Sequence, residues 1–174
     1  MLVPGRHYSV QAPLLAYIGE ALERRSIQVE RISWSPPDDA TPLWVAQQVG
    51  AVLAGMPGRP LVVGKSLGTM AAPLACASGR PLPGIWLTPL LREPFVLAAL
   101  RRPVEPALVV GGTADHLAGW EPELVASLSA TVHEVPDGDH SLMVPGPLAE
   151  SARVLGEIVR VVEQFLDDVV WPSP

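Results

Sequence analysis

Residues 61–68 read Leu-Val-Val-Gly-Lys-Ser-Leu-Gly, an apolar run that ends in a G-x-S-x-G segment at 64–68. The β-branched run before this segment and the helix-like stretch after it predict a buried strand, a tight turn and a helix. On such a turn the Ser66 hydroxyl projects from the sheet edge, beside the N-terminal amides of the helix. Larger side chains in place of Gly64 and Gly68 would collide with the neighbouring strand and helix. The stretch therefore predicts an α/β fold and a candidate nucleophile.

The same letters allow two other interpretations. A phosphate-binding loop has the pattern G-x-x-x-x-G-K-S/T, but Arg59 stands where its first glycine would be. An apolar strand also lies where that loop would run, so the sequence argues against a nucleotide site. The other interpretation is a structural turn in which Ser66 caps the helix. The motif alone does not decide between a cap and a nucleophile.

The residues that would activate a serine lie farther along the chain. A serine nucleophile needs a histidine to take its proton and a carboxylate to orient that histidine. Asp115 follows the apolar run at 107–111, and His140 follows the shorter run at 131–135. In an open α/β sheet the ligand site lies at the carboxyl ends of the strands. The sequence therefore predicts that Ser66, Asp115 and His140 meet at one edge of the sheet.

Together these motifs resemble the α/β-hydrolase family. The resemblance rests on the elbow at 64–68, the acid turn at 111–115, the histidine turn at 138–142 and the opening residues 2–6. The motifs follow the family's order and span almost the whole chain, which looks most like small lidless hydrolases. The resemblance implies a serine hydrolase that cleaves a small carboxylic ester or thioester through an acyl-enzyme, without a cofactor.

The resemblance also implies where an oxyanion and a substrate would bind. The backbone N–H of Leu67 would be one oxyanion donor, and the second would come from Arg6 or His7 in the first loop. Pro4 stands where the family usually has a histidine. Loops at the predicted active edge carry candidates for an apolar acyl or alcohol pocket: His7, Tyr8, Trp34, Leu90, Leu91, Leu117 and Met143.

Strand and helix signals alternate along the chain, which predicts one domain over residues 1–174, a three-layer α/β/α sandwich. We expect about six mostly parallel strands, at 2–3, 27–34, 61–65, 84–88, 107–111 and 131–135. The expected helices cover 12–25, 42–56, about 66–78, 93–102, 121–128 and 147–169. Pro73 lies inside the third helix, where it is expected to cause a kink. Only residues 89–93 are available where the family inserts a lid, so we expect a minimal core without one.

Composition excludes several classes of function. The net charge of −6 argues against nucleic-acid binding, which needs clustered Lys and Arg. No apolar run has the length of a transmembrane helix, and the chain starts without a signal-peptide pattern, so we expect a cytoplasmic protein. The four histidines lack metal-ligand spacing, and the single cysteine has no partner for an internal disulfide. The sequence does not indicate an oligomeric state.

Three charged residues near the motifs have competing interpretations. Lys65, the only lysine of the chain, is either a surface residue at the turn or a cation that holds the turn through a carboxylate or favours anionic substrates. Asp137 and Asp139 are alternative acids close to His140. A residue beside a histidine in a turn points poorly at its ring, so we expect both to have turn and capping roles.

Two other functions use the same residues or the same fold. A non-catalytic module would keep the α/β-hydrolase fold for binding, because a fold does not determine a function. An acyltransferase would use the same triad with an acceptor other than water. The first predicts a blocked pocket or a missing oxyanion donor, and the second differs from a hydrolase only in its products.

Overall fold

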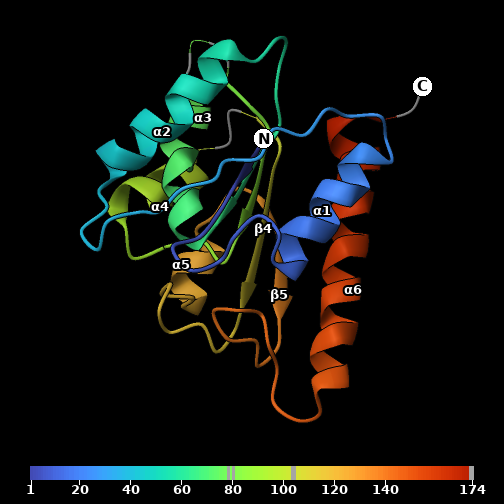
Figure 1. The fold of residues 1–174 in the computed structure, drawn as a ribbon. Coiled ribbons are helices and arrows are strands. Elements are labelled where there is room, and N and C mark those ends of the chain that lie inside the picture. Colours follow the sequence, from blue (N-terminus) through green and yellow to red (C-terminus); the bar gives the residue numbers. More distant parts are fainter. Residues whose placement is uncertain (78, 80, 103–104, 173–174) are drawn as a thin grey trace.

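A five-stranded, all-parallel sheet forms the centre of the computed structural model, which describes residues 1–77, 79, 81–102 and 105–172. The strands stand in chain order across the sheet: β1 (Leu2–Val3), β2 (Val62–Lys65), β3 (Gly84–Leu87), β4 (Ala107–Gly112) and β5 (Thr131–Val135). Helices cover both faces, as the three-layer prediction requires (Figure 1). One face carries α1 (Pro13–Glu23) and α6 (Leu148–Phe165), and the other carries α2 (Pro42–Gly55), α3 (Ala72–Ala77), α4 (Pro94–Leu100) and α5 (Pro122–Ala126). Only residues 88–93 connect β3 to α4, which leaves no room for a lid domain.

The sixth strand predicted over 27–34 is reduced to a single bridge, so the prediction of six strands is wrong by one. Arg31 pairs with Leu2 in the parallel sense. The Leu2 N–H donates to the Glu30 carbonyl at 2.8 Å, and the Ile32 N–H donates to the Leu2 carbonyl at 3.0 Å. The ladder stops there because β1 has only two residues and the next residue, Pro4, has no N–H to donate.

The chain changes its direction of travel across the sheet at β1. After β1 it passes through α1 to the 27–34 segment on one side, and then returns through α2 to β2 on the other side. Such a reversal opens a crevice at the carboxyl ends of the two strands, where ligands of open α/β sheets bind. The 4–8 loop follows β1, and Ser66 follows β2 at this crevice.

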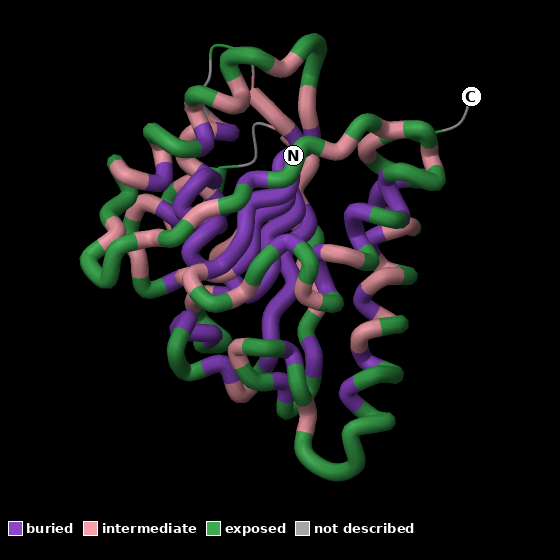
Figure 2. The backbone as a smooth tube through the Cα atoms, in the orientation of Figure 1, coloured by how far each residue is buried: buried purple, intermediate pink, exposed green. Residues whose placement is uncertain are grey.

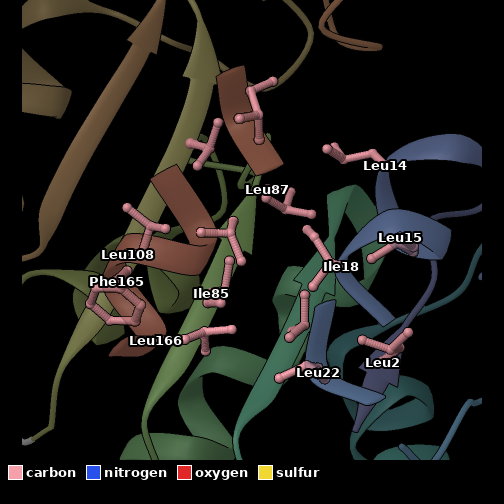
Figure 3. Close-up of a cluster of buried hydrophobic side chains, with 14 of the residues drawn as sticks. Leu2, Leu14, Leu15, Ile18, Leu22, Ile85, Leu87, Leu108, Phe165 and Leu166 are labelled. Carbon is pink, nitrogen blue, oxygen red and sulfur yellow. The ribbon is translucent and has the colours of Figure 1, made fainter. Parts of the chain in front are cut away.

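Two hydrophobic cores attach the helices to the sheet. In the first, Leu15 and Ile18 of α1 belong to the same cluster of buried side chains as Ile85 of β3 and Leu108 of β4 (Figure 3). Along α6 buried positions recur at helical spacing, and exposed positions lie between them (Figure 2). Fully burying one leucine or isoleucine side chain contributes about 1.5–3 kcal/mol relative to exposure. The second core lies beneath α2 to α5 on the opposite face.

The helix after the turn begins later than predicted. Ser66–Ala71 form a 3₁₀ helix, and α3 follows over Ala72–Ala77. Pro73 therefore lies in the first turn of α3, where its missing N–H costs no intrahelical hydrogen bond. The kink predicted from Pro73 is wrong for that reason, and the predicted helix end at Ser78 lies outside the described residues. At the other end of the chain, α6 continues into a π-helical turn over Leu166–Val170.

Candidate active site

The turn after β2 holds Ser66 in a left-handed backbone conformation with a φ of 51°. Such a conformation costs a non-glycine residue about 1–3 kcal/mol and persists only where the surroundings fix it. Here the Thr69 hydroxyl donates to the Ser66 carbonyl at 2.6 Å and accepts the Leu90 N–H at 3.2 Å. These two bonds tie the strained turn to the loop that follows β3.

Close backbone packing explains the glycines on either side of Ser66. A Cβ atom on Gly64 would lie 2.7 Å from the Gly68 carbonyl oxygen, and one on Gly68 would lie 2.4 Å from the Val3 carbonyl oxygen. Real Cβ atoms do not approach backbone atoms so closely. The collision predicted for larger side chains at these two positions is therefore confirmed.

Ser66, His140 and Asp115 form a continuous chain of hydrogen bonds. The Ser66 Oγ lies 2.7 Å from His140 Nε2, and His140 Nδ1 lies 2.8 Å from Asp115 Oδ2. The other carboxylate oxygen, Oδ1, accepts the Ala118 N–H at 3.0 Å. Because an ionised carboxylate only accepts hydrogen bonds, Nδ1 carries the proton and Nε2 is free to accept the serine proton. The Asp115 side chain is fully buried, whereas 26% of the His140 side chain is exposed.

The two other aspartates near His140 have turn roles. The Oδ1 atom of Asp139 accepts the N–H groups of Ser141 at 2.7 Å and Met143 at 3.0 Å. Asp137 has a φ of 56°, and its N–H donates to the Thr113 hydroxyl at 2.8 Å. The predicted turn position is confirmed for both residues, and the predicted capping role is confirmed for Asp139.

An open pocket of about 460 Å³ lies beside Ser66. Its walls come from loops that follow β1, β3, β4 and β5, from the end of β2 with the 3₁₀ helix after it, and from the segment before α2. The lining residues are Gly5, Arg6, His7, Tyr8, Ala40, Lys65, Ser66, Leu67, Met70, Leu90, Glu93, Leu117, His140 and Ser141. Leu117 is largely exposed at the rim. The sequence motifs gave no signal for Met70 or Glu93, because these residues reach the pocket only through the placement of the helix after the turn and of the Leu90 loop.

The structure brings four of the predicted pocket residues to the pocket wall and leaves three elsewhere. His7, Tyr8, Leu90 and Leu117 line the pocket. Leu91 is 1% exposed and belongs to the core beneath α2 to α5, so it is not available to a substrate. Met143 is exposed and lies outside the lining residues. Trp34 also lies outside them and supports the first loop.

Hydrogen bonds from neighbouring segments hold the 4–8 loop at the pocket. The Gly5 N–H donates to the Tyr8 carbonyl at 3.0 Å, and the Trp34 indole N–H donates to the Gly5 carbonyl at 3.2 Å. The Tyr8 hydroxyl accepts the Leu14 N–H at 3.0 Å in the first turn of α1. A guanidinium nitrogen of Arg6 donates to the Pro37 carbonyl. The loop is therefore fixed although Pro4 departs from the family's pattern.

Lys65 is buried rather than at the surface, so the surface interpretation is wrong. Only 1% of the residue is exposed. Its Nζ atom donates to the Thr88 hydroxyl at 2.7 Å and to the His140 carbonyl at 2.8 Å, and it lies 4.9 Å from the centre of the Tyr8 ring. Burial lowers the pKa of Lys65 to about 8, against the opposing effect of the Asp115 and Asp139 carboxylates.

The acidic, histidine and cysteine side chains do not gather into a metal site in the part of the chain that the structure describes. Within residues 1–77, 79, 81–102 and 105–172, no group of three or more His, Cys, Asp and Glu side chains has a geometry that would hold a metal ion. None of the helices in these ranges combines the length and apolar character needed to cross a bilayer. His116 is exposed beside Asp115, and His133 lies in β5.

No protein-family model matches this sequence, and no curated protein matches it either. Solved structures do match the fold. An α/β serine hydrolase homologue from Coxiella burnetii has a TM-score of 0.71 at 14% identity, with 95% of this chain and 84% of that chain covered. A serine hydrolase without a lid from Xanthomonas campestris has a TM-score of 0.58 at 19% identity, with 99% and 83% covered. Est1E from Butyrivibrio proteoclasticus, whose structure holds ferulic acid, has a TM-score of 0.65 at 13% identity, with 98% and 88% covered. The chain therefore has the fold of the α/β serine hydrolases, in a form without a lid.

Proposed function

We propose that this protein is a serine hydrolase that cleaves small carboxylic esters or thioesters. The observation that carries the proposal is the hydrogen-bonded chain from Ser66 Oγ through the His140 ring to the buried Asp115 carboxylate. This chain ends at an open pocket, so an acyl carbonyl has access to the serine oxygen. The strained backbone of Ser66 supports the proposal, because strain of this kind clusters at functional sites.

Ser66, His140 and Asp115 then have distinct roles in the reaction. His140 Nε2 takes the Ser66 proton as Oγ attacks the acyl carbonyl, and it gives that proton to the leaving alcohol or thiol. Asp115 holds the proton on Nδ1 and stabilises the imidazolium that forms. A water molecule, activated by the same nitrogen, then attacks the acyl-enzyme and releases the carboxylic acid and free Ser66.

Two backbone N–H groups are proposed to stabilise the oxyanion. Leu67 is the second residue of the 3₁₀ helix, so its N–H has no carbonyl partner within that helix. Arg6 lines the same pocket from the 4–8 loop and would supply the second donor through its backbone. Each such donor is worth about 10²–10³ in rate.

The pocket supports a substrate of small to medium size. Its apolar residues Tyr8, Met70, Leu90 and Leu117 suit an aliphatic or aromatic acyl or alcohol group. Polar groups on the same walls include Arg6, His7 and Glu93. The ferulic acid in Est1E makes an aromatic acyl ester a reasonable test substrate.

Labelling with a fluorophosphonate tests the proposal directly. We expect the wild-type protein to gain one phosphonyl group on Ser66, measured by intact mass and peptide mapping, because His140 activates this hydroxyl. Ser66→Ala should gain none. A panel of p-nitrophenyl esters, an ethyl ferulate and acyl-thioesters would then rank acyl groups, and product analysis would separate hydrolysis from acyl transfer. A folded wild-type protein that is not labelled at Ser66 would refute the enzyme and favour a binding module.

A further inference from the structure

Lys65 is a buried cation for which the reaction proposed above has no role. It is the last residue of β2, and its Nζ atom contacts residues that follow three other strands. These are Tyr8 after β1, Thr88 after β3 and His140 after β5. One ammonium group therefore connects the carboxyl ends of four strands of a five-stranded sheet.

Two of these contacts are to residues outside the helices and strands: one is to the side-chain hydroxyl of Thr88 and the other to the backbone carbonyl of His140. Thr88 is buried with a φ of 44°, a genuine outlier for a β-branched residue. His140 lies in the long loop between β5 and α6, where Leu142 also has a positive φ of 62°. Strained backbone of this kind needs surrounding contacts to persist. Lys65 donates one hydrogen bond to the strained Thr88 and another to His140, which lies two residues before Leu142.

We propose that Lys65 is a positioning residue that holds the backbone of His140, so that the imidazole stays within hydrogen-bond distance of Ser66 and Asp115. The inference rests on the serine hydrolase function proposed above. Lys65 acts through the His140 carbonyl and touches no reacting atom. Its role is to maintain the 2.7 Å separation between Nε2 and the serine oxygen.

An ammonium group suits this position better than a hydrocarbon. It has three N–H donors: Thr88 and His140 accept two hydrogen bonds, and the face of the Tyr8 ring lies at cation–π distance. Hydrogen bonds from an ionised donor are roughly twice as strong as neutral ones. A misplacement of about 1 Å in a catalytic group costs about 10² in rate, so loss of this contact is expected to slow acylation strongly.

The charge of Lys65 also makes the contact sensitive to pH. Titratable groups near Nζ are Tyr8 from the first loop, Asp115 from the loop after β4, and Asp139 and His140 from the loop after β5. Burial lowers the pKa of Lys65 to about 8. The ammonium form is therefore present below pH 8 and is lost as the pH rises through 8. The neutral amine has fewer N–H donors than the ammonium and carries no charge, so it holds the His140 carbonyl less strongly. The wild-type acylation rate should therefore fall as the pH rises through 8.

The test compares Ser66 labelling rates of the full chain in four forms: wild type, Lys65→Met, Lys65→Arg and Val63→Ala. Rates are measured with one fluorophosphonate from pH 6 to 9.5, at a temperature where circular dichroism shows each form folded. Val63 is the matched control, because it lies two residues earlier on β2, is fully buried and packs in the core beneath α1 and α6. The Val63→Ala variant removes core packing and leaves the hydrogen bond from Lys65 to His140 in place.

We expect Lys65→Met to be labelled about 10- to 100-fold more slowly than wild type. Val63→Ala should stay within about threefold of wild type although its melting temperature falls. Lys65→Arg should recover part of the rate and lose the decline near pH 8, because a guanidinium stays charged throughout this range.

The outcomes distinguish failure of the positioning role from failure of the hydrolase function. Wild-type labelling combined with a Lys65→Met rate within threefold of wild type would overturn the positioning role alone. An equal loss of rate in Val63→Ala would assign the effect to general destabilisation and would also overturn it. A wild-type protein that is not labelled at Ser66 would overturn the hydrolase function, and the positioning role with it.

Discussion

Replacing His140 with alanine is expected to lower kcat/KM for a p-nitrophenyl ester by about 10⁵- to 10⁶-fold. The Ser66 hydroxyl would lose the ring nitrogen that lies 2.7 Å from it, and a neutral serine hydroxyl is a weak nucleophile without an adjacent base. Some catalysis over the uncatalysed reaction should remain from the oxyanion donors and from substrate binding. Steady-state kinetics at a high enzyme concentration would measure the residual activity of His140→Ala beside the wild-type activity.

Asp115→Asn should cost less, about 10⁴-fold in kcat. The asparagine would keep the size of the side chain, and its amide oxygen would still accept the Ala118 N–H. Its NH₂ group would favour the wrong histidine tautomer, with the proton on the nitrogen that faces Ser66. The order of the two effects follows from the geometry, because His140 touches the nucleophile and Asp115 acts through His140.

His116 provides the matched control for His140→Ala. It is an exposed histidine next to Asp115 and is not among the residues that line the pocket. His116→Ala should keep kcat/KM within about twofold of wild type and leave the melting temperature unchanged. More than a tenth of wild-type activity in a folded His140→Ala protein would contradict the proposed role of His140.

The meeting of Ser66, Asp115 and His140 was predictable because each residue follows a strand that is visible in the sequence. An apolar β-branched run precedes Ser66, another precedes Asp115, and a shorter run precedes His140. Parallel strands present their carboxyl ends at one edge, so three local signals were sufficient to predict a shared location. The same reasoning predicted both layers of helices and the absence of a lid.

The burial of Lys65 was not predictable from local patterns. It is the only charged residue in the strand-and-turn segment, and a lysine beside a turn is normally solvated. Its acceptors come from Thr88 and His140, which lie 23 and 75 residues away in the chain. Only the assembled sheet shows that two oxygen atoms and an aromatic ring meet at this point.

The errors in the predicted elements have similar non-local causes. The alternating pattern at 27–34 is typical of a strand, but on this side β1 pairs only through Leu2, because the next residue that would pair, Pro4, has no N–H to donate. Pro73 was expected to kink a helix because the helix was assumed to start at Ser66. Instead a 3₁₀ helix comes first, and the α-helix starts one residue before Pro73.

Replacing Gly68 with alanine is expected to lower the free energy of unfolding by about 2–4 kcal/mol. The added Cβ would lie 2.4 Å from the Val3 carbonyl oxygen and 2.8 Å from the Pro4 carbonyl oxygen. Both obstacles are backbone atoms at the end of β1, so no side-chain rotation relieves the contact. The melting temperature should fall by about 4–16 °C, measured by calorimetry together with urea denaturation.

Gly156→Ala is the matched control for Gly68→Ala. Gly156 lies inside α6, and a Cβ atom there would meet nothing within 4 Å. Alanine in a helix interior is favoured over glycine by about 0.5–1 kcal/mol, so this variant should be slightly more stable than wild type. The two glycine-to-alanine changes should thus shift stability in opposite directions. Equal stability of Gly68→Ala and wild type would contradict the close approach of the turn to β1. Val3 and Pro4 lead into the 4–8 loop, which lines the pocket beside Ser66. The Gly68→Ala protein that remains folded should therefore also be labelled more slowly at Ser66.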